Sequence, residues 1–210
     1  MDINFLKIAL KTEIKNISSK TMFLVLACLA TPFIFKYFYV AKEYNYNILL
    51  GTILFSITLG VFQYILDSTT NDILNKINIF YSNLNIPRIY SLISKILICI
   101  PFVMTFFFLN LIFFKIKLIS SFILITLLLS INICLYTSII VSYFFDSNSM
   151  LFSTYLSMFF VLGLSFFILG LLILKINIIL ILISQLIIII IGFYILNRIY
   201  KLKKILIKIL

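Results

Sequence analysis

Residues that could carry out chemistry are few and scattered in this sequence of 210 residues. The sequence contains no histidine, which excludes HExxH zinc-protease motifs and Ser-His catalytic machinery. Its six acidic residues all lie in tails, in loops or at the ends of apolar stretches, so no two carboxylates are placed for an intramembrane aspartyl protease. The five glycines are too scattered for a phosphate-binding GxxxxGK loop. We therefore expect this chain to have no enzyme activity, no metal ligands and no ATP site of its own.

Neutral polar residues and the three cysteines lie within the apolar stretches. We interpret the polar side chains as interhelical hydrogen-bonding groups, and the cysteines as small apolar residues. Gly163 and Gly170, seven residues apart, predict a close contact between helices. An ion-coupled carrier usually keeps an ionisable residue near the middle of the membrane, so the energy for any transport is expected from another subunit. The residues concerned are Gln63, Asn110, Asn132 and Gln185, with Cys28, Cys99 and Cys134.

The elements that must hold these residues are membrane-spanning helices. Apolar residues make up 64% of the chain, against about 45–50% in a soluble domain, and the mean hydropathy is +1.25. The apolar stretches are long and continuous, whereas a β-barrel has short alternating segments. Since a helical span needs about 20 such residues, we predict a single all-α integral membrane domain with six transmembrane helices. They cover about residues 21–40, 47–66, 92–114, 118–143, 149–173 and 177–198.

The distribution of basic residues predicts how the chain is oriented. With the N-terminus inside, 12 of the 17 lysines and arginines fall on the cytoplasmic side. Both termini are therefore expected in the cytoplasm. Residues 3–19 place apolar side chains at helical spacing beside Lys7, Lys11 and Lys15, which predicts an amphipathic helix at the membrane interface. The basic tail over 199–210 is expected on anionic lipid, so the net charge of +11 needs no nucleic-acid partner.

Lys36 lies near the outer end of the first predicted span, between aromatic residues. Its ammonium group is expected to extend along the helix to the membrane interface. The alternative is a positively charged external vestibule, which would matter for an anionic substrate.

The longest loop, residues 67–91, lies on the predicted cytoplasmic side. Its apolar residues recur at helical spacing and predict a short helix over about 71–84, which ends before Pro87. Such a helix could lie on the membrane or dock into a groove on a soluble partner. The apolar positions are Ile73, Ile77, Phe80, Tyr81 and Leu84.

The order of these parts resembles the permease subunit of type-2 ABC exporters. That family has an interfacial N-terminal helix, six spans, and a coupling helix between spans two and three. Its loop often ends in a run such as Leu-Pro-x-Ser-Arg, with a lysine seven residues after the arginine. Here the run is Leu84-Asn85-Ile86-Pro87-Arg88, and Lys95 follows seven residues after Arg88. The proline is shifted by two positions, and Thr70-Asn71-Asp72 replaces the family's Gly-Thr and Glu-rich stretch.

The resemblance implies a transport subunit in a bacterial cytoplasmic membrane, driven by separate ATPase subunits that bind ATP and Mg. It implies a second permease copy or a sister permease as a further partner. The substrate would be hydrophobic or amphipathic, such as a peptide, a lipid or a drug. The coupling-helix contacts with the ATPase would be Asn71, Lys76, Phe80, Tyr81, Pro87 and Arg88.

Two other functions remain open on the sequence. A stand-alone membrane protein that confers immunity to a peptide toxin would also be small, with six spans and short loops. The substrate-binding component of a vitamin importer has a similar size and span number, but it would need a pocket with several polar groups.

Overall fold

The computed structural model describes residues 3–17, 22, 26, 30, 46–77, 81, 83, 84, 86, 87, 89–114, 120–144, 150–174 and 176–209. All regular structure in these ranges is helical. The helices are α1 (Ile3–Asn16), α3 (Tyr46–Leu74), α5 (Ile89–Phe114), α6 (Ser120–Phe144), α7 (Met150–Ile173) and α8 (Ile178–Ile209).

Five of these helices are long and apolar enough to cross a membrane. The five segments lie in α3, α5, α6, α7 and α8, and the protein has the fold of a helical membrane protein. They correspond to the second to sixth predicted spans. The first predicted span, residues 21–40, lies outside the described residues apart from three isolated positions, and Lys36 lies outside them as well.

Two helix ends differ from the expected boundaries. The second span was expected to end at residue 66, but α3 continues to Leu74, so residues 71–74 belong to the long helix and not to a separate one. The sequence from 67 to 72 is polar but contains no proline or glycine to end a helix. At the other end of the chain, α8 extends through the basic tail to Ile209.

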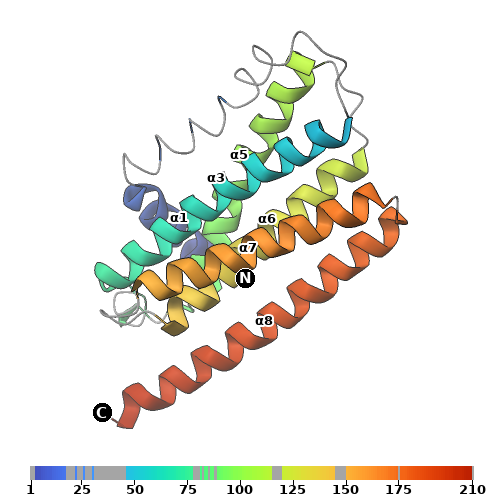
Figure 1. Ribbon diagram of the computed structural model, residues 1–210. Coiled ribbons are helices and arrows are strands. Elements are labelled where there is room, and N and C mark those ends of the chain that lie inside the picture. Colours follow the sequence, from blue (N-terminus) through green and yellow to red (C-terminus); the bar gives the residue numbers. More distant parts are fainter. Residues whose placement is uncertain are drawn as a thin grey trace.

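The spans run back and forth as a bundle, with α1 at one end (Figure 1). That end also holds the last turns of α3, the first turns of α5 and the C-terminal end of α8. At the opposite end, α7 continues to Ile173 and α8 begins at Ile178.

The centre of the bundle is α6, which packs against α3, α5, α7 and α8. Its buried side chains, such as Leu129 and Ile133, join the main apolar core. By contrast, α7 and α8 present many large apolar side chains outwards, and Phe159 is 81% exposed. Such surfaces suit contact with lipid or with another transmembrane helix.

The close approach between helices occurs at a different glycine from those expected. A Cβ atom on Gly192 of α8 would lie 1.9 Å from Leu135 Cδ2 of α6. Among the described residues, nothing lies within 4 Å of the corresponding position on Gly163 or Gly170. Gly192 therefore permits the α6–α8 contact, whereas the other two glycines face open space.

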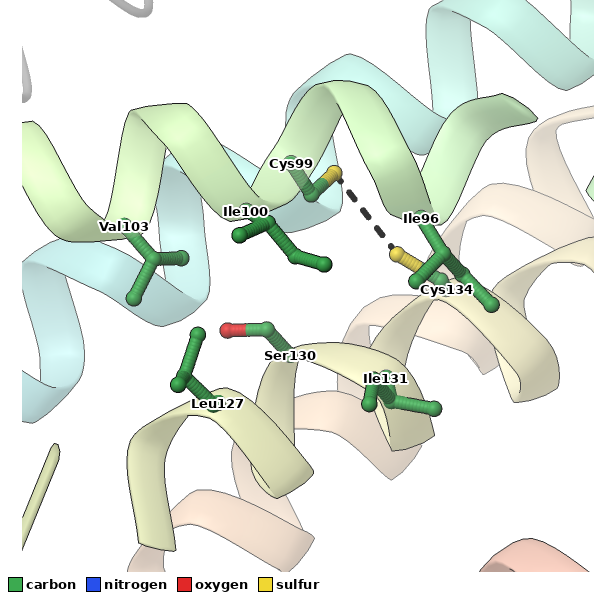
Figure 2. A pocket seen from close by; sticks show the side chains of 8 residues that line it. All are labelled: Ile96, Cys99, Ile100, Val103, Leu127, Ser130, Ile131 and Cys134. Atoms are coloured by element: carbon green, nitrogen blue, oxygen red, sulfur yellow. Dashed lines mark hydrogen bonds between the residues drawn. The ribbon is translucent and has the colours of Figure 1, made fainter. Parts of the chain in front are cut away.

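A small cavity lies between α5 and α6, lined mainly by aliphatic side chains (Figure 2). The sulfur atoms of Cys99 and Cys134 face each other at its wall, 3.7 Å apart. The nearby Ser130 hydroxyl donates a hydrogen bond to the Thr126 carbonyl within α6, at 2.8 Å.

Candidate functional site

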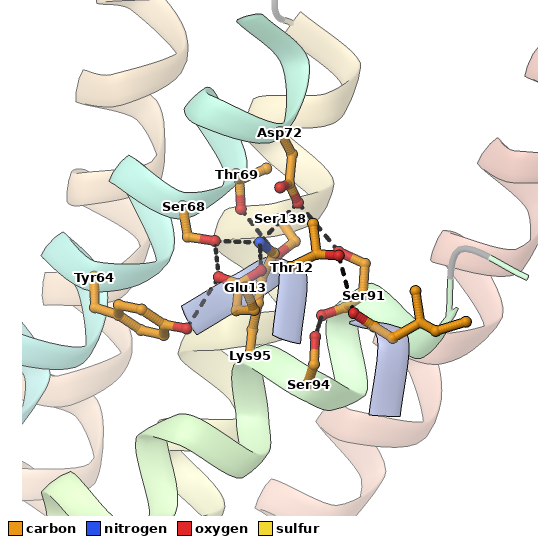
Figure 3. Close-up of polar contacts among 11 residues, drawn as sticks. Thr12, Glu13, Tyr64, Ser68, Thr69, Asp72, Ser91, Ser94, Lys95 and Ser138 are labelled. Carbon is orange, nitrogen blue, oxygen red and sulfur yellow. Dashed lines mark hydrogen bonds and ion pairs between the residues drawn. The ribbon is translucent and has the colours of Figure 1, made fainter. Parts of the chain in front are cut away.

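A buried cluster of charged side chains joins α1, α3 and α5 (Figure 3). The ammonium Nζ of Lys95 lies 2.8 Å from Glu13 Oε2 and 2.8 Å from Asp72 Oδ2. Glu13 is 1% exposed, Lys95 2% and Asp72 6%. Each charge comes from a different helix, so the cluster connects three elements that are far apart in sequence.

Hydroxyl groups complete the hydrogen bonding around the two carboxylates. Glu13 Oε1 accepts hydrogen bonds from the Tyr64 hydroxyl, at 3.0 Å, and from the Ser68 hydroxyl. Lys95 also donates to Ser68, and the Ser91 hydroxyl donates to Asp72 Oδ2 at 3.1 Å. These donors stabilise the negative charge of a cluster that holds two carboxylates and one ammonium group.

Helical spacing brings these residues together. Tyr64, Ser68 and Asp72 are four residues apart on α3 and therefore lie on one face. Ser91 and Lys95 have the same relation on α5, so the two helices present polar faces to each other. Asp72 lies near the end of α3 and Lys95 lies near the start of α5. Their ion pair therefore joins the two helix ends that the intervening segment links.

The cluster makes the attachment of α1 sensitive to any change of charge. Burying a single charge costs several kcal/mol, and only well-placed partners offset that cost. Removing one partner of a buried pair typically destabilises a protein by about 3–5 kcal/mol. Lys95 is the central member, because both carboxylates depend on it.

The segment between α3 and α5, residues 75–88, is called the α3–α5 connection here. Its described apolar side chains do not all face outwards. Ile77, Tyr81 and Ile86 are buried with Ala9 of α1 and Tyr90 of α5. The Phe5 and Tyr90 rings meet edge to face, with centroids 5.8 Å apart. The α3–α5 connection is therefore packed against α1, and its contact with Ala9 lies one helical turn before Glu13 of the charged cluster.

Backbone geometry shapes the start and the end of this connection. Lys76, the second residue after the end of α3, has a φ of 53°, in the left-handed region. The Ile86 amide donates a hydrogen bond to the Tyr81 carbonyl at 2.8 Å. Burial, together with the nearby negative charge of Asp72, raises the pKa of the Tyr81 phenol to about 12, so the hydroxyl stays protonated well above neutral pH.

The α1 helix has a packed side and an exposed side. Ala9 and Glu13 are buried against the bundle. Ile3 and Ile14, which the sequence pattern placed on the apolar face, are exposed, and Lys7, Lys11 and Lys15 are exposed too. The carboxylate of Glu13 therefore determines which side of α1 packs against the bundle as much as the apolar residues do.

The coupling-helix residues named from the sequence have different positions. Asn71 is half-buried in α3, Lys76 and Pro87 are exposed, and Tyr81 is buried against α1. Phe80 and Arg88 lie outside the described residues. The structure thus gives exposed positions to two of these residues, while Tyr81 faces into the protein.

Sequence analysis did not identify the charged cluster. Glu13 was placed in an amphipathic helix, Asp72 on the polar side of a short loop helix, and Lys95 only in the family motif. One signal was available, because Glu13 is the single acid among the lysines of α1. A lone carboxylate in a basic helix, together with an acid and a lysine at two span ends, could have suggested an ion pair.

The arrangement suits holding helices together more than catalysis. The charged atoms are buried, and the cavity between α5 and α6 is lined by other residues. Among the described parts of the chain, no group of three or more Cys, Asp or Glu residues could hold a metal ion.

Comparison with known proteins gives no relative: no family model, no curated protein and no solved structure matches this chain.

Proposed function

We propose that the chain is the membrane-spanning permease subunit of a type-2 ABC exporter in a bacterial cytoplasmic membrane. Both termini and the α3–α5 connection face the cytoplasm in this proposal. Separate ATPase subunits supply the energy, and a second permease, either the same chain or a sister chain, completes the pathway. The substrate is hydrophobic or amphipathic.

The observation that carries this proposal is the attachment of the α3–α5 connection to three helices. Apolar packing holds the connection against α1, and the Glu13–Lys95–Asp72 cluster holds α1, α3 and α5 at its base. A force applied to the connection would therefore move the adjoining turns of α3 and α5 together. A connection that only joined two spans would not need buried charges, which are costly to maintain.

The exposed side of the connection provides the docking surface for the ATPase. Leu84 is 45% exposed, Lys76 and Pro87 are exposed as well, and Leu74 at the end of α3, next to the connection, is 61% exposed. Among its described residues, this surface combines exposed apolar side chains with the positive charge of Lys76 and the neutral polar side chains of Asn75 and Asn83, so it fits an apolar groove bordered by an acidic residue. Tyr81 then serves as the anchor to α1, and not as a contact with the ATPase.

Movement of the ATPase dimer would reach the membrane through α3 and α5. Both helices pack on α6, so tilting them changes the interior of the bundle. The apolar outer faces of α7 and α8 are available to lipid and to the second permease.

The experiment is an affinity purification of the tagged protein from its native membrane in mild detergent, followed by mass spectrometry. The expected result is a stoichiometric soluble protein with a P-loop. Leu84→Asp should reduce its recovery at least about tenfold, because a buried charge opposes apolar docking. Asn83→Asp is the matched control, since Asn83 is an exposed neighbour and already polar.

Two results would overturn the proposal. One is recovery of the protein alone from several mild detergents. The other is equal recovery of the ATPase with Leu84→Asp and with wild type, which would show that Leu84 is not part of a docking surface. Recovery of the protein without any partner would favour the alternative function, immunity to a peptide toxin.

A further inference from the structure

The exposed side of α1 is both basic and apolar. Lys7, Lys11 and Lys15 follow one another at four-residue spacing, so they project from one side of the helix, and all three are exposed. Ile8 and Ile14 lie beside them and are 37% and 61% exposed. These five residues are called the outer face of α1 here.

The outer face carries no compensating negative charge. Glu13 is the only acidic residue of α1, and it is buried with its carboxylate 2.8 Å from the Lys95 ammonium group. Among the described residues, no carboxylate forms an ion pair with Lys7, Lys11 or Lys15. The buried cluster therefore leaves three positive charges on the outer face of α1 without a partner in the described parts of the chain.

The contacts on the packed side of α1 change along its length. Ala9 packs with residues of the α3–α5 connection, such as Tyr81. One turn later, Glu13 accepts a hydrogen bond from Tyr64, which lies in the apolar segment of α3 that is long enough to span a membrane. After another turn, Ile17 packs on the main apolar core. The chain therefore runs from the connection toward the apolar part of the bundle along α1, which lies at one end of the spans (Figure 1).

We propose that the outer face of α1 binds an anionic phospholipid, with Lys11 and Lys15 on the headgroup phosphate and Ile14 against the acyl chains. A helix that approaches the apolar core from the end of a bundle crosses the headgroup layer, where the phosphates lie. Lysine side chains extend toward that layer, and an apolar neighbour inserts below it. Ile14 is next to Lys15 and three residues after Lys11, so one lipid can contact all three side chains.

The composition of the outer face favours a lipid over a nucleic acid or a free anion. Proteins that bind nucleic acid add polar or aromatic side chains to their basic residues, whereas the outer face adds isoleucines. A free phosphate would gain nothing from the isoleucines. An anionic lipid uses both parts of the face, because charge attraction and apolar insertion both strengthen binding at a membrane interface. Each lysine near an anionic surface raises the affinity about fivefold.

Tryptophan fluorescence in the full chain tests this contact, because the sequence contains no tryptophan. Ile14→Trp places a single probe on the outer face, and the protein is reconstituted in nanodiscs of phosphatidylglycerol and phosphatidylcholine at equal mole fractions. Bromine atoms on the acyl chains of one lipid or of the other quench the probe, and the two experiments together give the preference. Ile8→Trp is a second probe if Ile14→Trp disturbs folding. Ile187→Trp, at an exposed position of α8, is the control.

The expected result is a preference for phosphatidylglycerol of at least about tenfold at Ile14→Trp and below about twofold at Ile187→Trp. Lys11→Gln with Lys15→Gln should remove the preference at Ile14→Trp. Lys11→Arg with Lys15→Arg should keep it, because both charges remain. Equal quenching by the two lipids, no quenching by either lipid, or a preference that survives the glutamine pair would each overturn the inference.

A second condition separates a lipid from a free anion. Sodium phosphate in place of sodium chloride, at equal ionic strength, should leave the preference unchanged, because free phosphate makes no contact with Ile14. Loss of the preference in phosphate would assign the lysines to a free anion and overturn a lipid as the ligand. The nanodiscs contain neither an ATPase nor ATP, so the outcome is independent of the purification experiment.

Discussion

The α1–α3–α5 end of the bundle and the α6–α8 interface are held together by different physical contacts. At the first, two carboxylates and an ammonium group are buried together. At the second, Gly192 lets the helices approach closely, and neutral groups make the hydrogen bonds. Tyr136 donates to the Ile188 carbonyl at 3.0 Å, and Asn132 donates to the Gln185 carbonyl at 3.4 Å.

This difference indicates which contacts between helices can transmit force and which can shift when the helices move. A buried ion pair tolerates little displacement, because any loss of contact leaves charges unpaired in a medium of low dielectric constant. Contacts made by apolar side chains in a membrane can shift without such a penalty, since lipid replaces them at small cost. We therefore expect the charged end to move as a unit.

The largest effect is expected when the central charge of the cluster is removed. Lys95→Met leaves Glu13 and Asp72 buried without their cation, so the free energy of unfolding should fall by about 3–5 kcal/mol. Unfolding by sodium dodecyl sulfate in mixed micelles measures this change. Lys76→Met is the control, because Lys76 is exposed, and its effect should stay within about 0.5 kcal/mol.

A triple variant separates loss of packing from loss of charge balance. Lys95→Met combined with Glu13→Gln and Asp72→Asn removes every charge of the cluster, and it should recover most of the lost stability. If the triple variant were as unstable as Lys95→Met alone, unpaired charge would not be the cause.

An intermediate effect is expected at the α6–α8 interface. Gly192→Leu places a side chain where Leu135 already lies, and overpacking of this kind costs about 1–3 kcal/mol. Gly163→Leu adds the same side chain where nothing lies within 4 Å among the described residues, so it should cost less than Gly192→Leu. Thermal unfolding in detergent compares the two, and equal losses of stability would contradict the assigned contact.

The smallest effects are expected from the neutral polar groups. Tyr136→Phe removes one hydrogen bond and should cost about 0.6 kcal/mol, the average for such bonds in membranes. Gln185→Met should cost nothing or stabilise the protein, because neither polar side-chain atom of Gln185 has a partner among the described residues. A large loss of stability from Gln185→Met, measured by the same unfolding assay, would show that its amide has a partner.

Much of the helical arrangement follows from the sequence, because long apolar stretches can be satisfied in a membrane only as helices. The second to sixth predicted spans correspond to α3, α5, α6, α7 and α8. The end of α3 was missed, since polar residues from 67 to 72 suggested a loop although they continue the helix. Within this stretch Ser68 and Asp72 contact Glu13 and Lys95, and those contacts depend on tertiary packing.

The candidate site was harder to predict for the same reason. Sequence spacing identifies residues that share a face of one helix, such as Ser68 and Asp72, but not which face meets another helix. The contact between Cys99 and Cys134 and the close approach of α6 and α8 at Gly192 depend likewise on how separate helices pack. The apolar pattern around Tyr81 fits a docking helix, and it fits equally well the packing on α1 that the structure shows.

The most direct measurement is the distance between α1 and the α3–α5 connection during the proposed transport cycle. Spin labels at Lys11→Cys and Asn75→Cys, in the protein with its native cysteines replaced by serine, report that distance by double electron–electron resonance. A second pair, Asn75→Cys and Tyr155→Cys, reports the connection against α7. In a complex with the proposed ATPase, addition of ATP should change the second distance and leave the first unchanged. A change in the first distance as large as in the second would contradict a connection that is joined to α1 through the buried cluster.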